Sequence, residues 1–372
     1  MSSNNILKPM QRVERNSNLE LFRIILMLFI VAHHYVVNSL MMKDMSANPF
    51  ALNSMFFYLF GAWGKTCINA FVMITGYFMC KSHITLKKFL KLLFEIVFYN
   101  VIIYSVFIFT GYEKLNIWGI ICALVPVRVI GSGFSGAFLI FYLCIPFLNI
   151  LIKHLNEKMH LRLIGLLLFT YVILGTMPKF LVIMNYVSWF IVIYFIASYV
   201  RIYPKALFDK TKIWGFATIL SLLISIVSVV LCLRFSFGYY YFIADSNKIF
   251  AVITAFCSFM FFKNIKVKKS KVINIIASAS FGVLMIHANS DAMRQWLWSD
   301  TLQNAKVFHT NFCYFHFFCS VFGIYIVCTC IDLIRIYLIE KPFFKLYDKV
   351  SPKMYCVFNR IESKLLKTFN VN

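Results

Sequence analysis

The stretch Asn18–Asn38, NLELFRIILMLFIVAHHYVVN, decides how the rest of the chain is interpreted. It is apolar except at its ends, yet it carries Glu20, Arg23, His33 and His34. A charged side chain at the centre of a bilayer costs about 2.5 to 3.5 kcal/mol, so membrane segments that keep such residues usually use them. We therefore interpret the stretch as a first transmembrane helix that holds a reaction centre.

Two of these polar residues share one side of the predicted helix. Arg23 and His34 are eleven positions apart, which on an α-helix is about three turns and about 16 Å of rise. The helix would present a guanidinium near one membrane surface and an imidazole deeper in the hydrocarbon core, which is about 30 Å thick. His33 points about 100° away from His34, so the adjacent pair is a poor chelate and we expect no metal site.

The composition is that of a membrane protein. The 372 residues are 61% hydrophobic and only 14% charged, whereas soluble domains have about 25% charged residues. The net charge of +23 is compatible with binding to nucleic acid. However, the Lys and Arg residues lie in short clusters between apolar runs. This distribution favours contact with membrane lipids and argues against a nucleic-acid partner.

Ten apolar stretches predict an all-α, polytopic membrane helix bundle. They cover approximately residues 19–40, 55–79, 89–110, 134–153, 161–177, 181–200, 213–233, 247–263, 272–290 and 311–338. A further apolar run, Ile117–Ile130, is broken by Pro126 and Arg128. We interpret this run as an interfacial or re-entrant piece of a loop.

The charge pattern predicts the orientation of the bundle. Cytoplasmic loops of membrane proteins carry an excess of Lys and Arg. Here the excess alternates along the ten stretches, with basic flanks such as Lys87-Lys88 and Lys268-Lys269 on one side. Both termini are therefore predicted to be cytoplasmic, in a multi-pass protein of a cell membrane such as the bacterial plasma membrane. We divide the chain into a transmembrane domain, residues 1–340, and a basic cytoplasmic tail, residues 341–372.

Four polar residues inside the predicted spans are candidates for chemistry. His34, an imidazole with an ordinary pKa near 6.5, can act as a general base, or it can hold two membrane helices together through a hydrogen bond. Arg23 and Glu20 lie one turn apart, so they could form an interfacial ion pair, or Arg23 could bind a phosphate or carboxylate. Glu95 is either a proton partner or part of an interhelix bond.

Two further polar groups lie at the ends of spans. Lys88 and Lys91 belong to a basic cluster at the start of the third predicted helix, where they either set the topology or bind the phosphates of a cofactor. His287, Asn289 and Arg294 lie near the outer end of the ninth predicted helix. This second group suits a hydroxyl-rich ligand, or it belongs to an ordinary interfacial belt.

Motifs along the whole chain occur in a familiar order. They are Glu20, Arg23 and His34; Gly64–Phe78; Lys88-Phe89-Leu90-Lys91; Tyr142 with Pro146-Phe147-Leu148-Asn149; Ser280-Phe281-Gly282 with His287, Asn289 and Arg294; and Ile339-Glu340-Lys341-Pro342. Together they resemble the membrane-bound acyltransferase-3 family, in particular its polysaccharide O-acetyltransferase branch. The chain departs from that pattern at Thr75, where Ser is usual, at Leu284, where Tyr is usual, and at Gly136-Ala137, where an aromatic pair is common.

The resemblance implies an integral membrane O-acyltransferase. Such an enzyme transfers an acyl group, commonly acetyl from cytoplasmic acetyl-CoA, to a hydroxyl of a surface glycan such as capsule, exopolysaccharide or a lipid-linked precursor. A different acyl donor, for example a succinyl donor, remains open. The alternative from another class is a multipass transporter or flippase without acyltransferase activity, although the chain shows no internal repeat of the kind common in transporters.

The resemblance also implies roles for individual residues. His34 would deprotonate the hydroxyl or carry the acyl group transiently, and Arg23, beside Glu20, would orient the donor or stabilise negative charge. Acetyl-CoA, the acyl-CoA donor, would bind at the basic inner face near Arg23, Lys88 and Lys91. The residues expected at the carbohydrate or glycolipid acceptor are Tyr142, His287, Asn289 and Arg294.

Overall fold

Helices make up the regular secondary structure of the residues that the structure describes. The structure is a computed structural model, and it describes residues 16–127 and 133–351. The helices are α1 (Ser17–Val37), α2 (Met41–Ala47), α3 (Leu52–Gly61), α4 (Gly64–Met79), α5 (Leu86–Phe109), α6 (Ile117–Leu124), α7 (Phe134–His154), α8 (Glu157–Leu168), η1 (Phe169–Leu174), α9 (Tyr186–Ile202), η2 (Ala206–Asp209), α10 (Thr211–Arg234), α11 (Ile249–Asn264), α12 (Lys271–Ser278), α13 (Ser280–His287), α14 (Asp291–Arg294), η3 (Gln295–Thr301), α15 (Asn304–Phe308), α16 (Cys313–Ile334) and η4 (Arg335–Glu340). The predicted all-α fold class is confirmed.

Six helical segments among the described residues are long and apolar enough to cross a membrane. They are Ser17–Val37, Leu52–Met79, Leu86–Phe109, Phe134–His154, Thr211–Arg234 and Cys313–Ser351. Lys271–His287 and Asp291–Thr301 would add a seventh if this pair, bent by 94°, is one span. A polytopic bundle is thus confirmed. Each of the ten predicted stretches contains helix, but α9 and α11 are shorter than these six, so the number ten and the cytoplasmic termini stay predictions.

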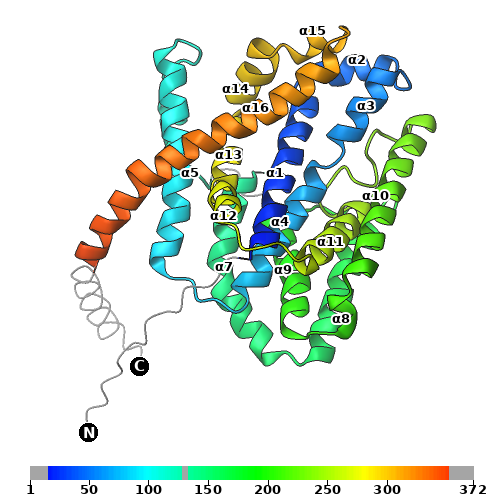
Figure 1. Cartoon of the computed structure of the whole chain (residues 1–372), viewed down its shortest axis with the longest axis vertical. Coiled ribbons are helices and arrows are strands. Elements are labelled where there is room, and N and C mark those ends of the chain that lie inside the picture. Colours follow the sequence, from blue (N-terminus) through cyan, green and yellow to red (C-terminus); the bar gives the residue numbers. More distant parts are fainter. Residues whose placement is uncertain (1–15, 128–132, 352–372) are drawn as a thin grey trace.

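α1 lies at the centre of the bundle (Figure 1). It packs against α3, α4, α11, α12, α13 and α16. Phe22 stacks on Phe262 of α11 with ring centroids 4.3 Å apart, and the buried Tyr35 places its hydroxyl 2.8 Å from His316 Nδ1 on α16. The helix that carries Glu20, Arg23, His33 and His34 therefore packs against helices from both halves of the chain.

Two glycines allow the region of α3 and α4 to approach α1. A Cβ on Gly61 would come within 2.9 Å of Val36 Cγ1, and a Cβ on Gly64 would overlap the ring of His33. The helix is interrupted between these glycines, and a new helix, α4, begins at Gly64. The amino end of α4 therefore lies at the level of the two adjacent histidines of α1.

Polar side chains cap several helices at the position where sequence preference favours Ser, Thr, Asn or Asp. The capping residues are Thr85 for α5, Asn116 for α6, Asn156 for α8, Asn185 for α9, Ser270 for α12 and Ser290 for α14. α4 and α7 begin without a side-chain cap. Their first backbone N–H groups are therefore not satisfied by a capping side chain.

A buried ionic cluster joins α5 to the last long helix. Arg335, 2% exposed, contacts three carboxylates: Asp332 Oδ1 at 2.7 Å, Glu340 Oε2 at 2.7 Å and Glu95 Oε1 at 3.1 Å. The Tyr99 hydroxyl donates to Asp332 Oδ1 at 2.6 Å. Glu95 thus makes the interhelix contact that was one of its two interpretations.

The predicted tail and the predicted re-entrant piece lie only partly within the described residues. The segment Cys313–Ser351 continues past residue 340, where we placed the start of the tail, and residues 352–372 lie outside the described part of the chain. The π-helical segment η4 ends at Glu340, two residues before Pro342. A proline lacks the backbone N–H and its ring crowds the preceding turn, so regular α-helical bonding is disrupted there. The predicted re-entrant piece contains the short helix α6, and residues 128–130 of it lie outside the description.

Candidate active site

A cavity of about 250 Å³ lies beside the His34 end of α1. It is enclosed by α1, the amino ends of α4, α7 and α9, and the segment at the end of α13. The described residues that line it are Ile30, His33, His34, Gly64, Lys65, Ile68, Gly133, Phe134, Ser135, Tyr186, Leu284, Met285, Ala288, Asn289 and Arg294. Segments far apart in the sequence therefore meet at the predicted reaction centre.

His34 forms a hydrogen-bonded pair with His287. His34 Nδ1 lies 2.9 Å from His287 Nε2, and the ring centroids are 5.1 Å apart. His287 is fully buried, and its Nδ1 lies 2.6 Å from the carbonyl oxygen of Val283, one turn earlier in α13. The imidazole pair thus links α1 to the backbone of α13.

The Val283 carbonyl determines where the protons of this pair lie. A carbonyl oxygen only accepts, so His287 Nδ1 carries a hydrogen, and in the neutral ring Nε2 carries a lone pair. That lone pair accepts the Nδ1–H of His34, which places the lone pair of His34 on Nε2. We therefore assign His34 to the Nδ1–H tautomer, with Nε2 available to accept a proton.

The neighbouring imidazole of His33 makes a different contact. Its Nδ1 lies 2.5 Å from the Gly61 carbonyl oxygen, and its ring centroid is 5.5 Å from that of His34. Within residues 16–127 and 133–351, no group of three or more His, Cys, Asp or Glu side chains is placed to hold a metal ion. Through its contact with Gly61, His33 joins α1 to the end of α3, and it also forms part of the cavity wall.

Arg23 lies on the same stripe of α1, toward the other end of the helix. Its Nη1 is 3.1 Å from Glu20 Oε1, so the predicted ion pair is confirmed. Its Cζ lies 5.8 Å from the centroid of the Phe71 ring on α4, and its Nε is buried without a partner. The guanidinium is thus held on one side by Glu20 and retains unused hydrogen-bonding capacity.

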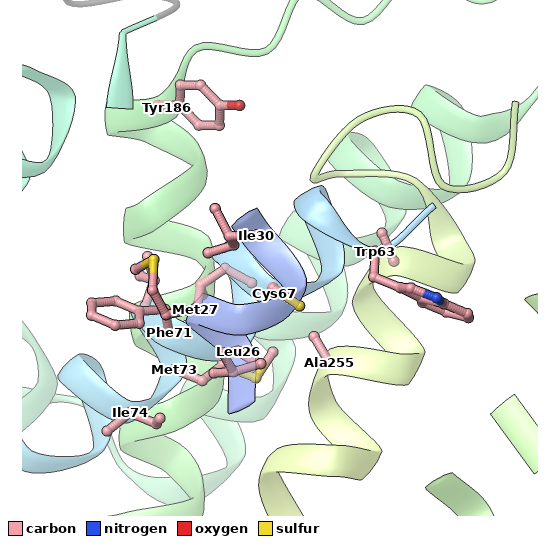
Figure 2. Close-up of a cluster of buried hydrophobic side chains, with 14 of the residues drawn as sticks. Leu26, Met27, Ile30, Trp63, Cys67, Phe71, Met73, Ile74, Tyr186 and Ala255 are labelled. Atoms are coloured by element: carbon pink, nitrogen blue, oxygen red, sulfur yellow. The ribbon is translucent and has the colours of Figure 1, made fainter. Parts of the chain in front are cut away.

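Apolar side chains fill the space along the stripe between Arg23 and the cavity. Met27 and Ile30 of α1 are 1% and 3% exposed, and Phe71 of α4 is 9% exposed. Figure 2 draws these three in one buried cluster, with Tyr186 beyond Ile30. Arg23 contacts α4 at Phe71, and His34 lies at the cavity where α4 begins. Arg23 thus faces α4, whereas His34 bonds to His287 of α13, and an apolar stretch of α1 separates the two polar groups.

The residues predicted for the acceptor fall into two groups. Asn289 and Arg294 line the cavity, and Asn289 Nδ2 also donates to Asn100 Oδ1 at 2.9 Å. His287 is not among the described lining residues, because it lies behind His34 with both ring nitrogens engaged. Tyr142, half-way along α7, is not among them either. This geometry suits a positioning role for His287, and its contact with a ligand stays a prediction.

The residues predicted for the donor do not form one site among the described residues. Lys91 pairs with Glu340 at 3.0 Å and lines a separate cavity of about 730 Å³, together with Lys271 and Lys341. Lys88 Nζ instead donates to the His83 carbonyl oxygen at 2.8 Å. Neither Lys88 nor Arg23 is a described lining residue of that cavity. The three cations thus occupy three different surroundings.

Lys65 and Tyr186 line the cavity, but the sequence analysis did not single them out as site residues. Lys65 Nζ donates to the Tyr186 hydroxyl at 2.7 Å and lies 5.3 Å from the centroid of that ring. Lys65 was visible as a charged residue within the second apolar stretch, which is a recognised sign of function. Tyr186 carries no such signal, because tyrosines are common wherever helices meet a membrane surface.

Comparison with known families decides the class of this site. The acyltransferase-3 model, described as an acyltransferase domain, matches residues 16–333. The chain belongs to the membrane-bound acyltransferase-3 family. The match includes α1, the cavity and the His34–His287 pair, and it makes the chain a multi-pass membrane acyltransferase. No curated protein and no solved structure matches the chain.

Replacing His287 in this acyltransferase is expected to slow transfer while leaving acceptor affinity intact. His287→Leu removes the nitrogen that accepts the hydrogen bond from His34 Nδ1–H, so the His34 ring loses its fixed tautomer. We expect kcat to fall about 10- to 100-fold, which is part of the rate enhancement that a general base supplies. His287→Gln keeps an amide oxygen that can accept the same hydrogen. Steady-state kinetics of both variants should show a lower kcat with unchanged KM for Leu and partial recovery for Gln. Equal losses for both variants would contradict a positioning role.

Proposed function

We propose that this acyltransferase moves acetyl from cytoplasmic acetyl-CoA to a hydroxyl of a cell-surface glycan or its lipid-linked precursor, in the bacterial plasma membrane. The observation that carries the proposal is that His34 lines the cavity while its Nδ1 is bonded to His287, which in turn is bonded to the Val283 carbonyl; this chain of contacts leaves the Nε2 lone pair of His34 to accept a proton. The polar groups that share the lining, among them Asn289 and Tyr186, suit a ligand rich in hydroxyls.

The chemistry requires one proton to leave the acceptor and one to reach the leaving group. His34 Nε2 takes the proton of the attacking hydroxyl as its oxygen bonds to the thioester carbonyl carbon. The carbon–sulfur bond then breaks, and the imidazolium returns the proton to the CoA thiolate. In a two-step version, the Nε2 lone pair bonds to the acyl carbon as the carbon–sulfur bond breaks and CoA departs as the thiolate. The hydroxyl then attacks the acyl-imidazolium, the carbon–nitrogen bond breaks, and the hydroxyl proton goes to the thiolate. Both versions use the same lone pair.

The position of Arg23 supports a donor that enters from the other end of the α1 stripe. Its unused Nε and its place beside Phe71 suit an anionic group at the end where the basic flanks cluster. Met27 and Ile30 lie between Arg23 and His34 along this stripe of α1, and Phe71 of α4 packs beside the guanidinium. The thioester arm would have to pass these side chains, which can change rotamer more readily than the helices can move apart.

The proposal is tested by the acetyl content of surface glycan. Cells that produce the protein are expected to release acetate from purified glycan on mild alkali treatment, and cells without the gene are expected to release none from the same glycan. Purified protein in detergent should then transfer labelled acetyl from acetyl-CoA to that glycan. A loss of surface glycan without a change in acetyl per sugar would favour the transporter or flippase alternative. Succinyl release in place of acetate would identify a different donor.

A further inference from the structure

The cavity beside His34 carries positive charge that no lining side chain neutralises. Lys65 and Arg294 both line it, and none of its described lining residues is an acid. Their partners lie outward: Asp245 is 3.9 Å from Lys65 with its side chain 55% exposed, and Asp291 is 2.7 Å from Arg294 with its side chain 98% exposed. Such exposed pairs are weak because water screens them. The two cations therefore remain available to a ligand.

Three helix ends add to this positive potential. The first residues of α4 (Gly64 and Lys65), of α7 (Phe134 and Ser135) and of α9 (Tyr186) all line the cavity. The amino end of a helix carries about half a positive charge, and its free N–H groups bind anions. α4 and α7 lack a side-chain cap. α7 and α9 are 21 and 17 residues long, so each presents a developed dipole, whereas α4 follows α3 after only Ala62 and Trp63 and the carboxyl end of α3 partly offsets its amino end.

The hydrogen-bonding groups in the wall point to the same kind of ligand. The Tyr186 oxygen accepts from Lys65 Nζ, which directs the Tyr186 hydrogen elsewhere. Carbonyl groups at two helix ends near the cavity already have contacts. Arg294 Nη2 donates weakly to the Ala288 carbonyl at 3.4 Å, where α13 ends, and His33 Nδ1 lies 2.5 Å from the Gly61 carbonyl oxygen at the end of α3. Donors with positive charge thus dominate the wall, which is the surrounding that a carboxylate or phosphate oxygen requires.

We propose that the acceptor of this acyltransferase is an anionic glycan, with a carboxylate or phosphate close to the hydroxyl that receives the acyl group. The inference rests on the proposed function and names its substrate class. Lys65, Arg294 and the amino ends of α4, α7 and α9 hold the anion, while His34 Nε2 accepts the proton of the neighbouring hydroxyl. A neutral sugar of the same shape would not neutralise the positive charge of this wall, and such a mismatch between ligand and site discriminates between substrates.

Matched acceptor pairs test the proposal. One pair is a glucuronate-containing oligosaccharide and its carboxyl-reduced form; the other is a glycan phosphodiester and its dephosphorylated form. We expect kcat/KM to be about tenfold or more higher for one charged member than for its neutral counterpart, and the pair that responds identifies carboxylate or phosphate. Equal kcat/KM within both pairs would overturn the proposal.

Charge-removing variants separate acceptor recognition from stabilisation of the reaction's own oxyanion. Lys65→Met and Arg294→Gln should each raise KM about tenfold for the charged acceptor and leave the neutral acceptor unchanged. Lys306→Met, which removes an exposed lysine bonded to Gln303, is the matched control and should change neither. If both variants lower kcat equally for charged and neutral acceptors, the charge serves the oxyanion and the proposal fails.

Binding without donor distinguishes failure of this inference from failure of the proposed function. The same oligosaccharide pairs are titrated into purified full-length protein in detergent, with affinity measured by calorimetry. Preferential binding of the charged member, weakened by Lys65→Met, supports the inference even where no acyl group is transferred. Preferential binding without transfer contradicts the proposed function alone, and equal binding of charged and neutral members contradicts the inference alone.

Discussion

Replacing His34 by alanine is expected to lower kcat for acyl transfer by about 10²- to 10⁴-fold, the range that a positioned general base contributes. The variant removes the Nε2 lone pair whose position is fixed by the 2.9 Å bond to His287. KM for the acceptor should change little, because the cations and helix ends of the cavity stay in place. Initial rates with labelled acyl donor and purified protein in detergent give both constants.

The matched control for this variant is His160→Gln. His160 is fully buried, and its Nε2 lies 3.0 Å from the Phe195 carbonyl oxygen in a contact between α8 and α9. Glutamine can still donate to that oxygen, and the position is not part of the cavity lining. We expect near wild-type rates. If His34→Ala keeps wild-type kcat while folding normally, His34 is a packing histidine and the proposed mechanism is wrong.

The fold class was predictable because a membrane imposes a simple rule on sequence. Backbone groups in lipid must bond internally, so long apolar runs become helices. The rule does not locate an interruption within a span. α3 and α4 were predicted as one span, and together they form one segment long enough to cross a membrane, Leu52–Met79. The break between Gly61 and Gly64 was not predicted, because the close approach to Val36 and His33 becomes visible only once α1 is placed. The length of an apolar run also does not give the length of the helix that forms within it. α9 and α11 are shorter than the six segments that are long enough to cross a membrane.

The candidate site was predictable only along a single helix. Helical periodicity placed Arg23 and His34 on one stripe, and in the structure Arg23 faces Phe71 of α4 while His34 bonds to His287 of α13 at the cavity where α4 begins. Periodicity carries no information about contacts between helices, so it could not show that His287 bonds to His34, or that Lys65 reaches the same cavity. It also suggested that Lys88 and Lys91 act together, whereas their side chains have separate partners.

Arg335 is expected to be the residue whose loss most destabilises the fold. It is 2% exposed and lies within 3.1 Å of carboxylate oxygens of Asp332, Glu340 and Glu95. Arg335→Met takes the guanidinium from all three carboxylates and leaves Lys91 on Glu340, at 3.0 Å, and the Tyr99 hydroxyl on Asp332, at 2.6 Å. Removing one partner from a buried ionic cluster costs about 3 to 5 kcal/mol. Chemical unfolding in detergent micelles, followed by tryptophan fluorescence, measures the loss in the free energy of unfolding.

Two further variants show whether that loss comes from unpaired charge or from lost packing. Lys87→Met breaks the exposed pair between Lys87 of α5 and Asp348. The free energy of unfolding is therefore expected to change by only about 0 to 1 kcal/mol. Arg335→Met combined with Glu95→Gln and Asp332→Asn removes the guanidinium together with two of the stranded charges, and should recover most of the stability because replacing a whole buried ionic group is often neutral. If the combined variant is as unstable as Arg335→Met alone, the guanidinium stabilises α5 and the last helix by packing, and electrostatic pairing is secondary.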